Sequence, residues 1–394
     1  MYQKKVFEII SSLFIFILVF SFFNDNYMVN HFGENSLKVL FILFFLFYGL
    51  QIIKTIKHMK LFQDKLFFLY AISLTVVFLL ENILDLSNDI FKNTLTLISL
   101  FVVVIYFSRY SLRKLLYFVW ISIMSSVVMS FFNDPLTEWT FRTTGGTGDP
   151  NEFAAQVVAL FFVSIYLFNI NKSRLFLLIS IVFVIYGIFV AGSKTSFVVF
   201  ALVSTIALLR YLMYDIKKII NYKALIIVAS MLLVASQIQF TDIQAVKNIQ
   251  KRAESSGTFD KRVAAWNGGY YMAAAHPFIG IGLGDYGKYT RKYATVYADA
   301  TAPHNIYIKL VGESGIIVLL LFLFFLLTIF LENIKRMLRS NVFWIYAAFL
   351  SLLLMGMTLG ITYDKYFLLF IAIMLNINYL IKQRRVDDNF AHYT

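Results

Sequence analysis

The chain has 394 residues, of which 60% are hydrophobic, 18% aromatic and only 14% charged, with a formal net charge of +13 at pH 7. Soluble domains use many more charged residues, so the composition excludes a soluble protein and predicts an integral membrane protein. The absence of cysteine excludes disulfides and thiolate metal sites. The positive charge would suggest nucleic acid in a soluble protein, but here it is divided among loops between apolar segments, and no nucleic acid partner is expected.

Apolar segments long enough for transmembrane helices recur along the whole chain, and they are too long and too uniform for the strands of a barrel. They predict an all-α integral membrane protein with about twelve transmembrane helices, the first of them retained as a span. Residues 1–240 would hold nine helices, residues 241–304 a large external loop, and residues 305–394 three helices and a cytoplasmic tail. The expected spans are 6–23, 36–53, 66–82, 93–107, 115–132, 151–169, 175–190, 197–214, 224–239, 315–331, 342–360 and 366–381.

Basic residues set the expected orientation. The connections on one side carry most of the lysine and arginine, as in "KTIKHMKLFQDK", "SRYSLRK" and "KQRR", and the short loops on the other side hold acids. Basic loops stay in the cytoplasm, so both termini are predicted to be cytoplasmic. The stretch 241–304 is also basic, but loops longer than about 60 residues cross the membrane regardless of charge. Its basic excess predicts an anionic partner on the outside.

The external loop has helical periodicity. Phe240, Ile243, Val246 and Ile249 recur every third residue, which predicts an amphipathic helix on the membrane surface. A second helix is predicted to begin at Asp260 as N-cap and to end at Pro277. A loop that merely rests on lipid is the alternative.

Two glycine motifs resemble nucleotide-binding sequences and are rejected. "GLGDYG" has the spacing of a dinucleotide fingerprint, but no strand and helix of a Rossmann unit surround it. Its glycines, with Gly280, instead predict a turn that approaches another backbone closely. "GIFVAGSKTS" has one residue too many for a P-loop. Lys194, at a helix end on the outer side, is either a lysine reaching toward water or a phosphate contact.

Two further outer segments combine helix caps with charged groups. In "FRTTGGTGDPNEFAAQ", Asp149 or Asn151 can cap the next helix; a plain turn explains most of this sequence, but not Arg142 beside an apolar span. In "ATAPHNIYIKLVGESG", Pro303 predicts that His304 lies in the first turn of a helix, where nearby cations keep the imidazole neutral near pH 7. It is then either a base or only a hydrogen-bonding group. Lys309 and Glu313, four residues apart, are placed to pair.

Five segments occur in an order and at spacings that resemble the O-antigen ligase and polymerase superfamily of bacterial surface-polysaccharide enzymes: "GTGDPNEFA", "GSKTS", "RVAAW", "HPFIGIGLGDY" and "HNIYIKLVGESG". The resemblance implies a fold related to the GT-C class and a donor glycan on undecaprenyl diphosphate at the outer face of the inner membrane. It implies catalytic roles for His304 and Arg262. It also places Lys194 where many members carry arginine. Chain-length regulators and flippases are further partners that it implies.

Chemistry agrees with this resemblance. A lipid diphosphate brings its own leaving group, and without a visible metal-ligand cluster protein cations must stabilise it. We therefore expect an inverting, metal-independent glycosyltransferase without a cofactor, with His304 as base. Polymerisation of repeat units is favoured, with transfer to lipid A core as the alternative. A transporter of lipid-linked oligosaccharides is disfavoured because the spans are nearly free of charge. His276 is expected to be a turn residue. The residues expected to bind substrate are Lys194, Arg142, Asn151, Arg291, Trp266, Asn305 and Glu313.

Overall fold

The computed structural model describes residues 2–82, 88–132, 143–215, 257–282, 286–293, 303–332, 334–361 and 364–383, and every regular element in these ranges is a helix. The first nine helices are α1 (Tyr2–Phe23), α2 (Asp25–Phe32), α3 (Ser36–His58), α4 (Phe62–Asn82), α5 (Asn88–Phe107), α6 (Leu112–Met129), α7 (Pro150–Asn171), α8 (Arg174–Ala191) and α9 (Lys194–Asp215). The remaining helices are α12 (Gly257–Ala275), α13 (Tyr286–Tyr293), α14 (Ile306–Leu331), α15 (Ile334–Arg339), α16 (Phe343–Met355) and α17 (Lys365–Lys382).

The predicted all-α membrane protein is confirmed at this level. Within the described ranges, eight helices are long and apolar enough to cross a membrane, and Leu95–Phe107 and Phe343–Met355 are shorter apolar helices. The predicted span at residues 224–239 and the predicted amphipathic helix at residues 240–249 lie outside these ranges. Twelve spans therefore stay a prediction.

The core of the bundle is α7. Its span is 94% buried, and it packs against α6, α8, α9 and α16. A helix that is apolar on all sides can be surrounded by lipid or by other helices, and α7 is surrounded by other helices. Around this core, helices such as α3 expose large apolar side chains, as expected for a surface in contact with lipid.

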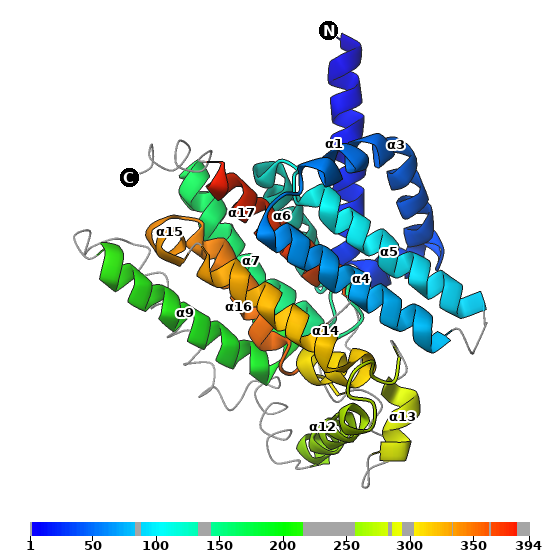
Figure 1. Ribbon diagram of the computed structural model, residues 1–394. Coiled ribbons are helices and arrows are strands. Elements are labelled where there is room, and N and C mark those ends of the chain that lie inside the picture. Colours follow the sequence, from blue (N-terminus) through cyan, green and yellow to red (C-terminus); the bar gives the residue numbers. More distant parts are fainter. Residues whose placement is uncertain are drawn as a thin grey trace.

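Two ion pairs fix which helix ends lie together. Lys365 at the start of α17 binds Asp25, just after α1, with 2.9 Å between Nζ and Oδ2, and Lys382 at the end of α17 binds Glu332, just after α14, at 2.8 Å. Helix α17 is therefore antiparallel to α1. The start of α1 and the end of α17 lie at one end of the bundle, which we call the terminal end, and α12 and α13 lie at the other, the cap end (Figure 1).

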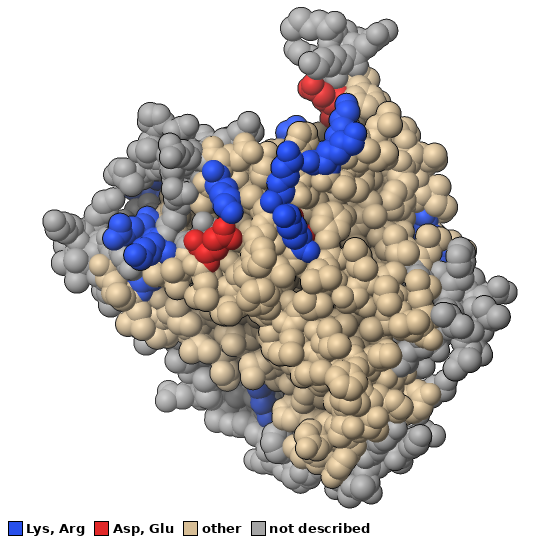
Figure 2. Space-filling view, viewed as in Figure 1, with Lys and Arg blue, Asp and Glu red and all other residues tan. Residues whose placement is uncertain are grey.

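Charge divides the molecule in the same way. On the face drawn in Figure 2, most Lys and Arg side chains gather toward the terminal end, and the middle of the face is almost free of charge. This distribution is typical of a membrane protein whose basic end faces the cytoplasm.

The start of α12 was predicted wrongly. The helix begins at Gly257, so Asp260 lies inside its first turn instead of serving as its N-cap. Acids are favourable in the first turn as well as at the cap, because the positive end of the helix dipole attracts both, and sequence alone does not separate these positions. The predicted end is confirmed, since α12 stops at Ala275, two residues before Pro277.

Candidate active site

The cap end is fixed to the bundle by a break in α14. At Gly315 the helix has φ 78° and ψ 175°, values that leave its neighbouring backbone groups free to bond elsewhere. The segment 277–282 forms hydrogen bonds with these backbone groups. The amides of Ile281 and Gly282 donate to the Gly312 and Glu313 carbonyls, each at 3.0 Å, and the Ile316 amide donates to Pro277 O at 2.8 Å.

Glycine is required on both sides of this contact. A Cβ on Gly315 would collide with the carbonyl of Phe278, and a Cβ on Gly280 would collide with the carbonyl of Glu313. Both residues also have positive φ, 78° and 80°, which side chains disfavour. The close backbone approach predicted from the glycines is confirmed at Gly280 and Gly282, and Gly284 lies outside the described residues. For Gly287 the predicted turn is wrong, because this residue lies within α13.

Tyr286 completes the attachment of the cap. Its ring is 2% exposed and lies between α12 and α14, where Gly269 and Gly312 leave room for it. Its hydroxyl donates to Ala265 O at 2.5 Å. Helix α13, the short helix that carries this tyrosine, was not predicted, because its eight residues are mostly polar.

Helix α14 begins three residues later than predicted, at Ile306 instead of Pro303. Asn305 is the N-cap, and its Oδ1 accepts from the amides of Tyr307 at 2.9 Å and Ile308 at 3.1 Å. Its Nδ2 donates to Met357 O at 3.2 Å. His304 therefore precedes the helix and adopts a left-handed φ of 44°. The prediction that Pro303 starts the helix was wrong because the asparagine side chain caps more strongly than proline can.

His304 lies among charged groups and is partly buried. Burial lowers the pKa of its imidazole below the usual value; Arg262, and to a smaller extent Lys309, lower it further, and Asp149 raises it. The ring is therefore neutral at pH 7. The predicted neutrality is confirmed in direction, with burial, which the sequence did not reveal, as its largest cause.

Trp266 positions the residue before the histidine. Its Nε1 donates to Pro303 O at 2.7 Å, and this bond joins α12 to the segment that carries His304. Because Arg262 and Trp266 are four residues apart on α12, they lie on one face of that helix. The "RVAAW" motif is therefore in direct contact with the residue that precedes the "HN" motif.

Asp149 connects the "GTGDPN" turn to the same place. It is the N-cap of α7, and its Oδ1 accepts from the amides of Asn151 at 2.6 Å and Glu152 at 3.3 Å. Of the two caps considered, Asp149 is the correct one, and Asn151 lies in the first turn. Its charge also acts on His304, a role that the sequence analysis did not assign.

A group of acids beside this site was missed. Asp25, Glu152 and Asp364 line a cavity of about 70 Å³ with Lys365 and Gln156. Burial raises the pKa of Asp364 to about 6; Lys309 opposes this shift, and Asp25 contributes to it. Acidic residues at the outer ends of three apolar segments were the available signal, but the segments are far apart in the chain. Within the described ranges, no three or more His, Asp or Glu side chains are arranged to hold a metal ion.

The other predicted site residues are placed as follows. Lys194 is the exposed first residue of α9. The preceding helix, α8, is joined near its end to the "TTGGTGD" segment by a bond from Thr143 N to Val190 O at 3.4 Å. Glu313 is fully buried beneath the cap. Arg142 and the side chain of Arg291 lie outside the described residues. Substrate contacts for all four stay predictions.

Comparison with known proteins identifies one family. Residues 179–323 match O-antigen ligase, so the resemblance predicted from the motifs is confirmed over this part of the chain. The matched range includes Lys194, Arg262, Trp266 and His304, whereas Arg142 and Asn151 precede it. No curated protein matches the chain significantly.

Proposed function

We propose that this chain, a member of the O-antigen ligase and polymerase superfamily through residues 179–323, is a membrane glycosyltransferase that joins lipid-linked oligosaccharide repeat units. The donor is a glycan on undecaprenyl diphosphate, and the acceptor is a hydroxyl of a second lipid-linked glycan. The observation that carries the proposal is a neutral, partly buried His304 within the electrostatic range of Arg262. In this proposal the His304 imidazole accepts a proton and the Arg262 guanidinium attracts the diphosphate.

The proposed reaction is a single displacement. The acceptor hydroxyl oxygen attacks the anomeric carbon of the donor, and the bond from that carbon to the diphosphate breaks, its electron pair leaving with the diphosphate. His304 takes the hydroxyl proton as the new glycosidic bond forms. Attack from the face opposite the leaving group inverts the anomeric configuration. A positioned base of this kind contributes about 10²- to 10⁴-fold in rate.

Arg262 has two effects in this scheme. Its positive charge lowers the pKa of His304, which keeps the base unprotonated, and its guanidinium matches the geometry of a phosphate. The leaving diphosphate gains negative charge as the bond breaks, so a fixed cation stabilises the transition state more than the bound donor. Lys194, Arg142 and Arg291 are the further cations proposed for the same leaving group.

Transfer of the glycan to lipid A core is the second candidate function. The matched family is described as O-antigen ligase, and the residues discussed above serve either acceptor, because both supply a hydroxyl. The donor half of the reaction is the same in both cases.

The test supplies purified protein with one synthetic repeat unit on undecaprenyl diphosphate, with and without lipid A core, and separates the products by size. We expect chains longer than one repeat in the absence of lipid A core. Product that forms only with lipid A core identifies a ligase, and folded protein that yields neither product contradicts glycosyl transfer. A chelator in a parallel reaction tests metal independence; loss of activity that divalent ions restore would contradict it.

The proposed orientation places the cap end outside and both termini in the cytoplasm. Because the chain has no cysteine, Lys60→Cys and Asn267→Cys introduce single labels at exposed positions of the two ends. In cells with a permeable outer membrane, an impermeant maleimide is expected to label Asn267→Cys before lysis and Lys60→Cys only after it. The reverse pattern would place His304 in the cytoplasm and remove the proposed donor.

A further inference from the structure

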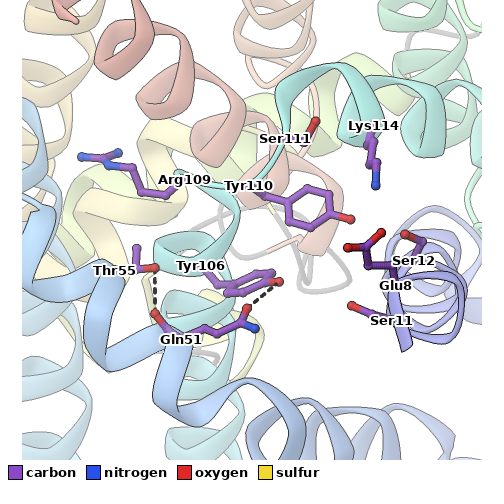
Figure 3. A pocket seen from close by; sticks show the side chains of 10 residues that line it. All are labelled: Glu8, Ser11, Ser12, Gln51, Thr55, Tyr106, Arg109, Tyr110, Ser111 and Lys114. Atoms are coloured by element: carbon purple, nitrogen blue, oxygen red, sulfur yellow. Dashed lines mark hydrogen bonds between the residues drawn. The ribbon is translucent and has the colours of Figure 1, made fainter. Parts of the chain in front are cut away.

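A second polar cavity lies at the terminal end, across the bundle from His304. It has a volume of about 300 Å³ and is built where α1, the end of α3 and the turn from α5 to α6 meet. Figure 3 shows Glu8, Ser12, Tyr110 and Lys114 directed toward one common space. Binding sites are typically cavities in which a small number of polar side chains converge to orient a ligand.

The walls of this cavity are held by hydrogen bonds between helices. Ser11 Oγ lies 2.6 Å from Tyr48 Oη, which joins α1 to α3. Tyr106 Oη donates to Gln51 Oε1 at 3.4 Å, which joins α5 to α3. Asn376 of α17 donates from Nδ2 to Tyr110 O at 2.7 Å and so fixes the turn between α5 and α6. The cavity is therefore preformed.

Arg109 does not supply the charge for a ligand in this cavity. Its guanidinium binds Asp64 Oδ2 at 2.6 Å and lies over the Tyr379 ring, 4.0 Å from the centroid. In Figure 3 it points away from Glu8 and Lys114. Its charge is therefore already neutralised by a protein partner.

Glu8 and Lys114 differ from Arg109 in this respect. Neither forms an ion pair within the part of the chain that the structure describes, although both line the same cavity. Lys114 also lies in the first turn of α6, whose N-cap Ser111 makes no side-chain capping bond. The uncapped amides and Lys114 make the wall formed by the start of α6 favourable for an anion. Glu8 makes the opposite wall, formed by α1, favourable for a cation.

We propose that this cavity binds the headgroup of a zwitterionic phospholipid, with its phosphate at Lys114 and the first turn of α6 and its primary ammonium at Glu8. A phosphoethanolamine headgroup carries these two charges a few bonds apart and has ammonium hydrogens to donate. A lipid is favoured over a soluble ligand because α1 and α3 also expose large apolar side chains, among them Ile9, Leu13, Leu46 and Leu50, on which acyl chains can lie.

The test titrates delipidated full-length protein in nonionic detergent with short-chain phosphatidylethanolamine, phosphatidylcholine or phosphatidylglycerol, or with soluble glycerophosphoethanolamine, and measures the unfolding temperature. We expect phosphatidylethanolamine to bind most tightly. Phosphatidylcholine should bind more weakly because its methylated ammonium cannot donate to Glu8. Equal binding of glycerophosphoethanolamine and the lipid would overturn the lipid as source. Preference for phosphatidylglycerol would overturn the zwitterionic ligand.

Two variants assign the headgroup charges. Lys114→Gln should weaken binding of both zwitterionic lipids about tenfold, as expected for loss of one charge-assisted hydrogen bond. Glu8→Gln should bring phosphatidylethanolamine down to the level of phosphatidylcholine. The side chains of Glu8, Lys114 and Lys60 are all exposed. Neither the two variants nor the control Lys60→Gln should therefore unfold the protein in the absence of lipid. If Lys114→Gln and Lys60→Gln have the same effect on lipid binding, the proposal is wrong.

Discussion

Buried charged groups interact with their neighbours in different ways at the two ends of the molecule. At the terminal end, Arg109 is bonded to Asp64 at 2.6 Å, and Arg210 donates from Nε to Leu338 O at 2.7 Å. The cap end also has a direct pair, Lys365–Asp25 at 2.9 Å, but charges that are not bonded to His304 act on it across space and help to lower its pKa, and burial raises the pKa of Asp364. Burial raises the pKa of the bonded Asp64 as well, so the difference between the ends is that His304 is a base beside a cation, whereas Asp64 is paired with one.

This contrast supports the proposal that the cap end is the reactive one. A structural ion pair is most useful when both partners remain charged and bonded at all times. A catalytic base must instead stay unprotonated until substrate arrives, and burial beside a cation provides this for His304. The two ends therefore predict different responses to substitution.

His304→Gln should produce the largest effect. Glutamine keeps part of the size and hydrogen bonding of histidine but cannot accept a proton near neutral pH, so chain extension should fall at least about 100-fold while donor binding is retained. The measurement compares product formation and binding of the lipid-linked donor at equal protein concentration.

His276→Gln is the matched control for this substitution. His276 is exposed in the turn after α12, so its replacement should leave activity near that of the unmodified protein. An active His304→Gln protein would remove the assignment of the base, and an inactive His276→Gln protein would show that the assay reports on the stability of the cap.

Arg262→Ala should lower activity less than loss of the base and should also change its pH dependence. Without the guanidinium, the pKa of His304 rises, because Arg262 is one of the causes that lower it. The base then becomes protonated at higher pH, so the acid limb of the rate profile should move upward. Lys194→Arg should retain most activity and leave this limb in place. If the acid limb is unchanged in Arg262→Ala, Arg262 does not influence the pKa of the catalytic base.

Sequence predicted which motifs lie near one another more reliably than it predicted their local structure. The motifs identified His304, Arg262 and Trp266, because each contains residue types suited to the chemistry. The backbone details were missed. Helix α14 begins at Ile306, after its N-cap Asn305, and not at Pro303. The break at Gly315 was not predicted, because a glycine inside an apolar run has many compatible conformations. Helix existence was predictable from apolar length alone.

The acids at the cap end show the second limit of sequence analysis. Asp25, Glu152 and Asp364 are separated by more than one hundred residues in each case, and no spacing rule connects them. Only the packing of α1, α7 and α17 places them around one cavity. Clusters formed by tertiary structure therefore need coordinates, whereas caps and spans are local and can be read from the chain.

Gly315→Ala tests whether the cap depends on the break in α14. The alanine Cβ would collide with Phe278 O and the backbone would be held in a glycine conformation, so unfolding free energy should fall by about 1–3 kcal/mol. Gly49→Ala in α3 is the control, since its Cβ would have nothing within 4 Å and alanine favours a helix. The two variants are compared by thermal unfolding and by protease cleavage within α12. If Gly315→Ala and Gly49→Ala are equally stable, the contact between the break in α14 and the segment 277–282 does not stabilise the cap end.

Asp364→Asn should have the smallest effect, a change in how stability depends on pH. Burial raises the pKa of this carboxyl to about 6 in the folded protein, with Asp25 adding to the shift, whereas an unfolded aspartate titrates near about 4. Between these values the folded state binds more protons than the unfolded state. The stabilisation from this group is therefore fully present below about pH 4 and is lost as pH rises toward about 6.

Asparagine cannot ionise, so in Asp364→Asn the unfolding free energy should depend less steeply on pH, and the variant should unfold at a higher temperature at pH 7. Glu34→Gln, at an exposed acid of the same end, should leave the slope unchanged. Unfolding temperatures from pH 4 to 7 decide the matter: if Asp364→Asn follows the unmodified protein throughout, the carboxyl is already charged in the folded state, and the electrostatic contrast between the two ends then depends on His304 alone.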